Sequence, residues 1–472
     1  MEIADNRPSS KKEQVEVMNK PAYDSVLGTK SIPLLYLRFA LAGILANVTL
    51  GIAAVVDGYF VSGFQELEVV GIGIGFTVMV ITRMLGVLLG VGAGAVISLR
   101  LGKGKIKEAR GIMGQTLWFT LFFSILLAVI GVVFENQIMT LFGASDEALP
   151  YAVKYSRLLW ISLPLTILAV VLSVLTNIDE KPVLSMSSWL VAAVLGGITE
   201  WIMVTKYDMG MMGSSWANTI SQSIPIFLIF YFWFGKTKLK PKMKDMMINL
   251  KTIGEVAWTG FASFSGLFMM FFAIIFFNNM LQSYGGGLHV AAFTIQNGYI
   301  TNMLSLVALG GMTGIQPIIS YNYGAGNLDR VKQAIKIGLI FTVALFVIVT
   351  AILIIFADPI MSFFSGGNPE LQKLGIWTTV VFNSLFTLNA VNLLISGYFE
   401  AQERNWSATF ISVSKMLLFL FPFLFIFPKF WGVEGIWYAG PAAEIPGVLI
   451  AIYFMKKEFK RLKDTNVKTV SL

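Results

Sequence analysis

The chain has 472 residues, of which 56% are hydrophobic and only 13% are charged, and its mean hydropathy is +0.73. A soluble protein carries about 25% charged residues, so this composition excludes a water-soluble globular fold and indicates a membrane protein. The net charge of +8 does not indicate a nucleic-acid partner, because the basic residues lie in short segments between apolar runs. The absence of cysteine and a single histidine, His289, exclude thiol chemistry, disulfides and Cys- or multi-His metal centres, so we expect no cofactor or metal.

From the N-terminus onward, the apolar runs predict twelve membrane-spanning helices, since roughly 20 apolar residues suffice for one crossing. Met1–Lys30 is polar and charged, so no cleavable signal peptide is evident. The predicted spans are Leu34–Ser62, Leu67–Leu99, Ile112–Phe134, Tyr155–Ile178, Val183–Thr205, Met211–Phe234, Ile253–Gln282, Val290–Ser320, Val331–Phe356, Leu374–Phe399, Trp406–Phe427 and Gly435–Met455.

A basic break containing KTKLKPKMKD separates the first six spans from the last six. The fold class is therefore all-α and membrane-embedded, with two six-helix bundles. The expected divisions are an N-terminal segment 1–33, a first bundle 34–235, a basic linker 236–252, a second bundle 253–457 and a tail 458–472.

The distribution of Lys and Arg predicts the orientation of the chain in the membrane. If the N-terminus is cytoplasmic, the inner segments hold 28 of the 35 basic residues and the outer ones hold five. This bias indicates that both termini are cytoplasmic. Six spans per bundle is an even number, so both bundles enter the membrane from the same side as parallel repeats.

A repeated segment supports this symmetry. Gly92–Gly104 reads GAGAVISLRLGKG, and Gly314–Gly326, in the other half of the chain, reads GIQPIISYNYGAG, with five identical positions. The same offset places Asp57 opposite Asn279, both in apolar surroundings. Two copies separated by about half the chain indicate two related structural units.

Ionisable residues inside the bilayer are the main functional signal, because burying them costs several kcal/mol. Asp57 and Glu200 each precede the outer end of their span by about five residues, which places both roughly 8 Å inside the boundary. Asn218 enters the sixth span to a similar depth, so the three side chains could share one pocket. The alternative is that the two carboxylates are interfacial and solvated, and for Glu200 both interpretations remain open.

Further polar residues suggest a path for a substrate. Arg83 lies in mid-span and either neutralises one of these carboxylates or contacts a substrate. Lys415 can extend to the cytoplasmic surface, which favours a structural role, and Glu255 and Glu444 lie near span ends. In the second bundle the candidates for lining a cavity are Asn279, Gln296 and Asn383.

These residues together resemble the multidrug and toxic compound extrusion (MATE) transporters. The matching motifs are ISLRLGKG and QPIISYNYGAG after spans two and eight, VVDGYFVSG, ANTISQ, the Asn pair at Asn278, and SKMLLFLFPFLFIFP. The resemblance covers nearly the whole chain and is specific to the bacterial multidrug-exporter branch. It implies a V-shaped pair of six-helix bundles that exports organic, often cationic, compounds in exchange for H⁺ or Na⁺.

Carried over to this chain, the resemblance makes Asp57 the acid that couples ion flow. Glu200 stands where the family has Asp in an N-x-x-x-D-P pattern, but Gly196 and Trp201 replace the Asn and Pro. Asn218 stands where Thr is common. Because Na⁺ needs several fixed oxygen ligands and a proton needs one carboxyl, these departures favour H⁺.

We therefore expect a proton-coupled antiporter that works by alternating access, a monomer in the bacterial inner membrane whose partners are small organic substrates and lipid. The alternative in the same superfamily is a flippase for lipid-linked oligosaccharide or lipid, for which only Arg83 and Lys415 argue. A membrane enzyme would need clustered catalytic side chains, which a single histidine disfavours.

Overall fold

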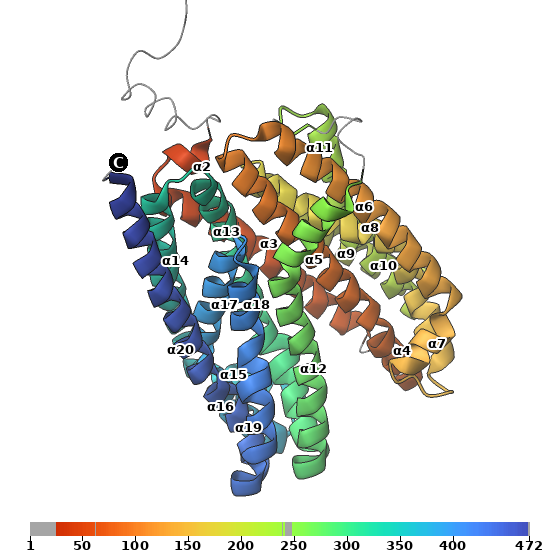
Figure 1. Ribbon diagram of the computed structural model, residues 1–472. Coiled ribbons are helices and arrows are strands. Elements are labelled where there is room, and N and C mark those ends of the chain that lie inside the picture. The colour runs from red at the N-terminus through yellow and green to blue at the C-terminus, as the bar shows by residue number, and fades with distance from the viewer. Residues whose placement is uncertain (1–24, 62, 238, 241–247, 471–472) are drawn as a thin grey trace, which may run out of the picture.

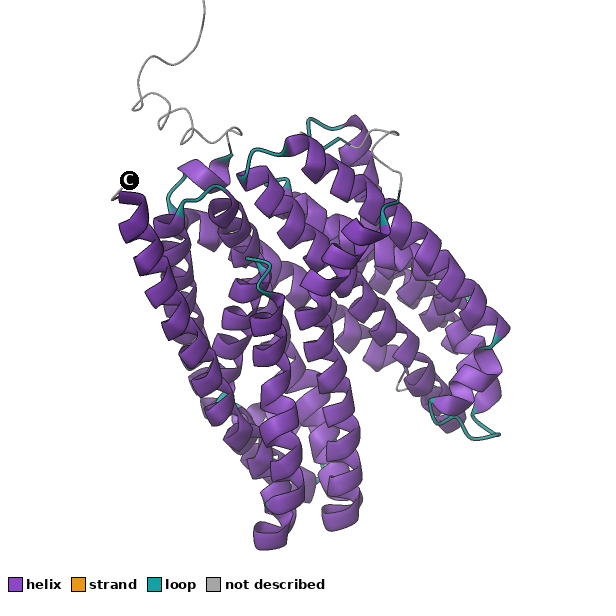
Figure 2. Cartoon of the chain, viewed as in Figure 1, coloured by secondary structure: helices purple, strands orange, loops and turns teal. Residues whose placement is uncertain are grey.

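A computed structural model of the chain describes residues 25–61, 63–237, 239–240 and 248–470. Every regular element in these ranges is a helix, and no strand occurs among them (Figure 2). The predicted all-α fold is confirmed. Part of the predicted basic linker, residues 238 and 241–247, lies outside the described residues.

The described helices account for twelve membrane crossings. Ten continuous helices are long and apolar enough to span a membrane, and one bent pair, Pro369–Asn383 with Phe386–Glu400, makes an eleventh candidate. The longest of the ten, Leu250–Gly324, contains Gly286 with a φ of 67°, which interrupts the helix and divides it into two crossings. The predicted count of spans is confirmed.

The first six spans form one lobe, the N-lobe, around a central helix, α8, which contacts α4, α5, α6 and α10. Its elements, with π-helical η1 and 3₁₀-helical η2, are α2 (Val26–Thr29), α3 (Ile32–Val61), α4 (Glu66–Gly75), α5 (Thr77–Gly102), α6 (Ile106–Val133), α7 (Glu135–Leu141), α8 (Leu149–Ile178), α9 (Pro182–Glu200), η1 (Trp201–Lys206), α10 (Met211–Ser223), η2 (Ile224–Phe227) and α11 (Leu228–Phe234).

The last six spans form the C-lobe, in which α17 contacts α13, α14, α18 and α20. Its elements, with π-helical η4 and η5, are α12 (Leu250–Ile295), η4 (Gln296–Thr301), α13 (Asn302–Gly324), α14 (Leu328–Ile355), α15 (Ala357–Phe364), α16 (Pro369–Asn383), α17 (Phe386–Glu400), α18 (Asn405–Ser414), η5 (Lys415–Leu420), α19 (Phe421–Ile426) and α20 (Pro428–Val470).

The two lobes form a V (Figure 1). They meet through α3 against α13 and α5 against α12, near the end of the molecule that carries α2 and the C-terminus. They diverge toward the opposite end, where α4 and α7 lie on one arm and α15 and α19 on the other. We call the first the closed end and the second the open end.

The predicted repeat is visible in the helix boundaries. Helix α6 (Ile106–Val133) and helix α14 (Leu328–Ile355) have the same length, and the offset between the two repeated segments also relates both of their ends. Their connections to the preceding helices are alike as well, because Gly104 and Gly326 have φ angles of 74° and 75°. The two lobes thus repeat this helix and the turn before it.

The outer faces of the lobes are apolar, as contact with lipid requires. On helix α6 large apolar side chains are exposed, and small or hydroxyl-bearing side chains face the lobe interior. This is the reverse of the pattern on a helix at the surface of a soluble protein. The exposed residues are Phe122, Leu126, Val129 and Val133, and the buried ones are Thr116, Thr120, Ser124 and Ala128.

Three details differ from the prediction. The tenth span, predicted as one helix, is bent by 41° between α16 and α17. The short helices α7 and α15 were not predicted, because each covers fewer than nine residues beside a longer apolar run. Helix α4 joins α5 at Phe76, where the chain turns slightly without leaving the helical region of φ and ψ.

Candidate functional site

The predicted acidic site lies in the N-lobe between α3 and α10. Asp57 is four residues from the end of α3, and its Oδ1 accepts hydrogen bonds from Ser214 Oγ at 2.7 Å and Asn218 Nδ2 at 2.8 Å. Ser214 and Asn218 are one helical turn apart on α10, so both point to the same carboxyl. Asn218 Nδ2 is also 3.4 Å from the hydroxyl of Tyr155 on α8.

Glu200 joins this group from the end of α9. Its side chain is 3% exposed, and its carboxyl interacts with the carboxyl of Asp57 and the hydroxyl of Ser214. Its Oε1 has no hydrogen-bond partner in the described part of the chain. Two adjacent carboxylates repel each other when both are ionised, so this geometry favours a proton or another cation between them.

The structure therefore brings together Asp57, Glu200 and Asn218, which the sequence placed at one depth. It adds Ser214 and Tyr155, which sequence reasoning missed. The spacing of four residues between Ser214 and Asn218 is the signal that could have identified the serine. Nothing in the local sequence of Tyr155 points to this site, since α8 brings it there only through packing.

Arg83 does not belong to the acidic site. Its Nη2 donates a hydrogen bond to Asn47 Oδ1 at 3.2 Å, and among the described residues it forms no ion pair with a carboxylate. Asn47 precedes Asp57 by ten residues on α3, which corresponds to about 15 Å along the axis. The interpretation of Arg83 as the counter-ion of Asp57 or Glu200 is therefore wrong.

Two of the three candidates in the C-lobe, Gln296 and Asn383, are joined through Thr301, and the third, Asn279, is not part of this group. Gln296 and Asn383 are 1% and 0% exposed, and they link η4 to α16 through Thr379 and Thr301. These buried hydrogen bonds stabilise the packing of η4 against α16. Of the residues they join, Thr301 lines the cavity of this lobe, whereas Gln296 and Asn383 do not. Asn279 is exposed on α12, and its Nδ2 donates to the carbonyl of Ile275 in its own helix.

A cavity of about 100 Å³ lies inside the C-lobe. Lys415 and Glu444 line it and form an ion pair, with Nζ 2.9 Å from Oε1. Lys415 is only 8% exposed, so the expectation that it reaches the cytoplasmic surface is wrong. The reason is that α20 supplies a carboxylate at the same depth, and the sequence does not show this pairing because the two residues lie in different helices.

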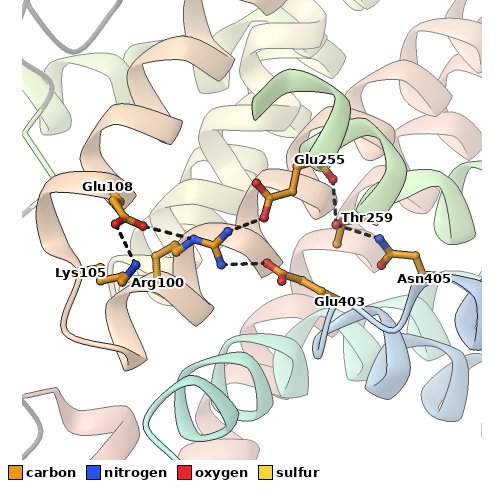
Figure 3. Close-up of polar contacts among 7 residues, drawn as sticks. All are labelled: Arg100, Lys105, Glu108, Glu255, Thr259, Glu403 and Asn405. Carbon is orange, nitrogen blue, oxygen red and sulfur yellow. Dashed lines mark hydrogen bonds and ion pairs between the residues drawn. The ribbon is translucent and has the colours of Figure 1, made fainter. Parts of the chain in front are cut away.

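A network of charged residues joins the lobes at the closed end (Figure 3). Arg100 of α5 contacts Glu255 of α12 and lies 3.5 Å from Glu403, which follows α17. Within its own lobe it lies 3.6 Å from Glu108. Burial raises the pKa of Glu403; Arg100 opposes this shift, and Glu255 adds to it. One guanidinium thus connects the two arms of the V.

Comparisons with known proteins agree with this architecture. The family model MatE matches residues 42–202 and 260–426. Multidrug export protein MepA of Staphylococcus haemolyticus (strain JCSC1435) is 23% identical over 436 residues, which cover 90% of this chain and 94% of that protein. Its counterpart in Staphylococcus aureus (strain MRSA252) is 24% identical over 407 residues, which cover 85% and 88%.

Two solved structures have the same fold. One is the outward-facing conformation of a multidrug resistance MATE family transporter of the MOP superfamily, with a TM-score of 0.88 at 18% identity, covering 93% of this chain and 98% of that one. The other is a MOP superfamily transporter from Pyrococcus furiosus, with a TM-score of 0.87 at 18% identity, covering 94% and 99%.

Proposed function

This chain belongs to the MatE family, and we propose that it is a secondary active transporter that exports organic, often cationic, compounds in exchange for protons. The relatives named multidrug export proteins support efflux as the activity. The observation that carries the proposal is the contact between Asp57 and Glu200, two carboxyls at membrane depth in one lobe.

The polar groups around Asp57 favour protons over Na⁺. Ser214 and Asn218 both donate hydrogen bonds to Asp57. A sodium ion bound at this carboxyl would need oxygen atoms as ligands, but these two residues direct O–H and N–H donors toward it. A proton needs only one carboxylate oxygen. Glu200 Oε1, which has no partner among the described residues, is available to bind a proton or to accept a hydrogen bond.

The V shape supports alternating access as the mechanism. With the closed end at the cytoplasm, the arms of the V diverge toward the outside, and protonation of Asp57 from outside would precede return to the inward-open state. Each inward proton supplies about 2.3 kcal/mol per 100 mV of membrane potential. It supplies about 1.4 kcal/mol more per unit of pH difference. For a substrate without net charge, together these support a roughly hundredfold to thousandfold gradient for each proton. For a monovalent cation the one-for-one exchange is electroneutral, so only the pH difference drives it, at about tenfold per pH unit.

The proposed setting is the bacterial inner membrane, with a monomer whose termini are cytoplasmic. The excess of Lys and Arg in the inner segments supports this orientation. In this proposed orientation α2, the C-terminal part of α20 and the Arg100 network lie on the cytoplasmic side.

Reconstituted vesicles test the proposal directly. A pH gradient without sodium is expected to drive uptake or release of a fluorescent organic cation against its gradient, and a sodium gradient at equal pH is expected to have no effect. Transport driven only by sodium would reject the proton. Absence of transport under both gradients, across a panel of cationic and anionic compounds, would reject the antiporter.

The flippase alternative gains no support from the geometry of the C-lobe. A pocket for an anionic oligosaccharide phosphate needs uncompensated positive charge. The charge of Lys415 is balanced by Glu444 at 2.9 Å.

A further inference from the structure

The C-lobe cavity contains a buried ion pair that the proposed proton site does not use. The side chains of Lys415 and Glu444 are 10% and 13% exposed and come from two segments that otherwise pack through apolar contacts. A buried ion pair is frequently no more stabilising than apolar residues of the same volume. At membrane depth, such a pair therefore points to a ligand-binding role.

The ion pair is only partly satisfied. Glu444 Oε1 accepts from Lys415 Nζ at 2.9 Å and from Asn389 Nδ2 at 2.8 Å. Glu444 Oε2 is buried and has no hydrogen-bond partner in the part of the chain that the structure describes. The ammonium of Lys415 has three N–H donors, and Glu444 is the acceptor that the described residues supply. Each ion thus keeps hydrogen-bonding capacity for a further group.

The other walls of the cavity are aromatic or neutral. Four phenylalanines line it. Three of them pack against one another, with Phe277 stacked on Phe293 at 5.0 Å and edge-to-face with Phe382 at 5.6 Å between ring centroids. Asn297, Thr301 and Ser305 add neutral polar groups. These walls suit an apolar body attached to a small charged group.

Charge balance decides which charged group fits. The cavity is neutral, because Lys415 and Glu444 cancel, and a ligand with one net charge would leave that charge uncompensated at low dielectric. A ligand with both an ammonium and a carboxylate adds no net charge. Its ammonium can donate to Glu444 Oε2 while its carboxylate accepts from Lys415 Nζ.

We propose that this C-lobe cavity binds the zwitterionic end of an organic compound, an ammonium and a carboxylate only a few ångströms apart, with Glu444 and Lys415 as the paired recognition groups. A volume of about 100 Å³ accommodates that end, and the body of the compound packs along the phenylalanines. The inference rests on the proposed function and deepens it. It gives the transporter a second class of substrate, which binds in the C-lobe, whereas the proton site lies in the N-lobe.

Binding can be tested without transport. The probes are L-phenylalanine, its methyl ester, which keeps only the cation, and N-acetyl-L-phenylalanine, which keeps only the anion. Titration calorimetry of the purified full chain is expected to show saturable binding of L-phenylalanine. Each analogue is expected to bind at least about tenfold more weakly than L-phenylalanine. The double variant Lys415→Met with Glu444→Gln removes both charges without leaving either unpaired, and it is expected to abolish the preference.

Glu135→Gln is the control, because it also removes a buried carboxylate from an ion pair, with Arg157, but lies in the other lobe. It is expected to leave binding of L-phenylalanine unchanged. Equal or tighter binding of the ester or of the N-acetyl compound would overturn the proposal. So would a preference for L-phenylalanine that persists in the double variant, or an absence of binding in the unchanged protein. Asp57→Asn must retain this binding even if it stops export, which separates failure of this site from failure of proton coupling.

Discussion

Gly102 of α5 and Gly324 of α13 face each other across the boundary between the lobes. A Cβ atom on Gly102 would lie 2.1 Å from the carbonyl oxygen of Tyr321, and one on Gly324 would lie 2.2 Å from the carbonyl oxygen of Leu99. Both glycines belong to the segment that the sequence contains twice. The repeated glycines therefore mark where the two structural units touch.

We predict that Gly102→Ala will destabilise the closed end. The added methyl group meets backbone, which cannot rotate away, so the cost is about 1–3 kcal/mol. Thermal unfolding in detergent should show a lower midpoint. The control is Gly254→Ala on α12, where no atom lies within 4 Å of the added carbon and helix propensity favours alanine. Equal midpoints for the two variants would contradict the prediction.

A second prediction concerns the Arg100 network. Arg100→Gln removes the cation that joins Glu255 and Glu403 to the N-lobe, so the equilibrium should shift away from the state closed at this end. A contribution of about 1 kcal/mol corresponds to roughly a fivefold change in population.

The absence of cysteine makes this shift measurable. Ser98 is fully buried between the lobes and donates to the carbonyl of Pro317 at 3.2 Å, so a single Ser98→Cys reports opening of the closed end. Thiol labelling should become about fivefold faster with Arg100→Gln. Lys332→Gln, whose partner Asp329 is in the same helix, should leave the rate unchanged. An unaltered rate in Arg100→Gln would show that the network does not hold the lobes together.

The third prediction assigns the roles of the two carboxyls. Asp57→Asn keeps the size of the side chain and its hydrogen bonding but cannot release a proton, so substrate binding should persist while uphill export is lost. Asp57→Glu should retain part of the export. Glu200→Gln removes the adjacent charge and should leave export weaker but present, with its pH dependence displaced. Full export by Asp57→Asn under a pH gradient would transfer the coupling role to Glu200.

Arg83 provides the fourth prediction. Because its hydrogen bond goes to neutral Asn47, Arg83→Met should preserve expression, and Asp57→Asn should not act as a compensating second change. Arg157→Met is the matched comparison, since it leaves the buried carboxylate of Glu135 without its partner and should lower stability by about 1–3 kcal/mol. A drop in expression for Arg83→Met that Asp57→Asn restores would re-establish the ion pair that the geometry contradicts.

The fifth prediction is topological. Cysteines placed at Lys103, Lys242 and Asn327 should be labelled only from the cytoplasmic side, and those at Glu66, Asp146 and Asn368 only from outside. The distribution of Lys and Arg is the basis of the assignment. Lys242 lies outside the described residues, so its side of the membrane is predicted from the sequence alone. External labelling at Lys242 would overturn the division into six and six spans.

The sequence by itself determined the membrane class, the twelve spans and the two related halves, because these depend on length, hydropathy and charge along the chain. It also placed Asp57, Glu200 and Asn218 at one depth, since depth follows from the distance to a span end. Only the tertiary structure decided which side chains on different helices contact one another. Arg83 turns to Asn47, Lys415 pairs with Glu444 and Arg100 reaches the other lobe, because the rotation and neighbours of each helix are set by packing between segments far apart in the chain.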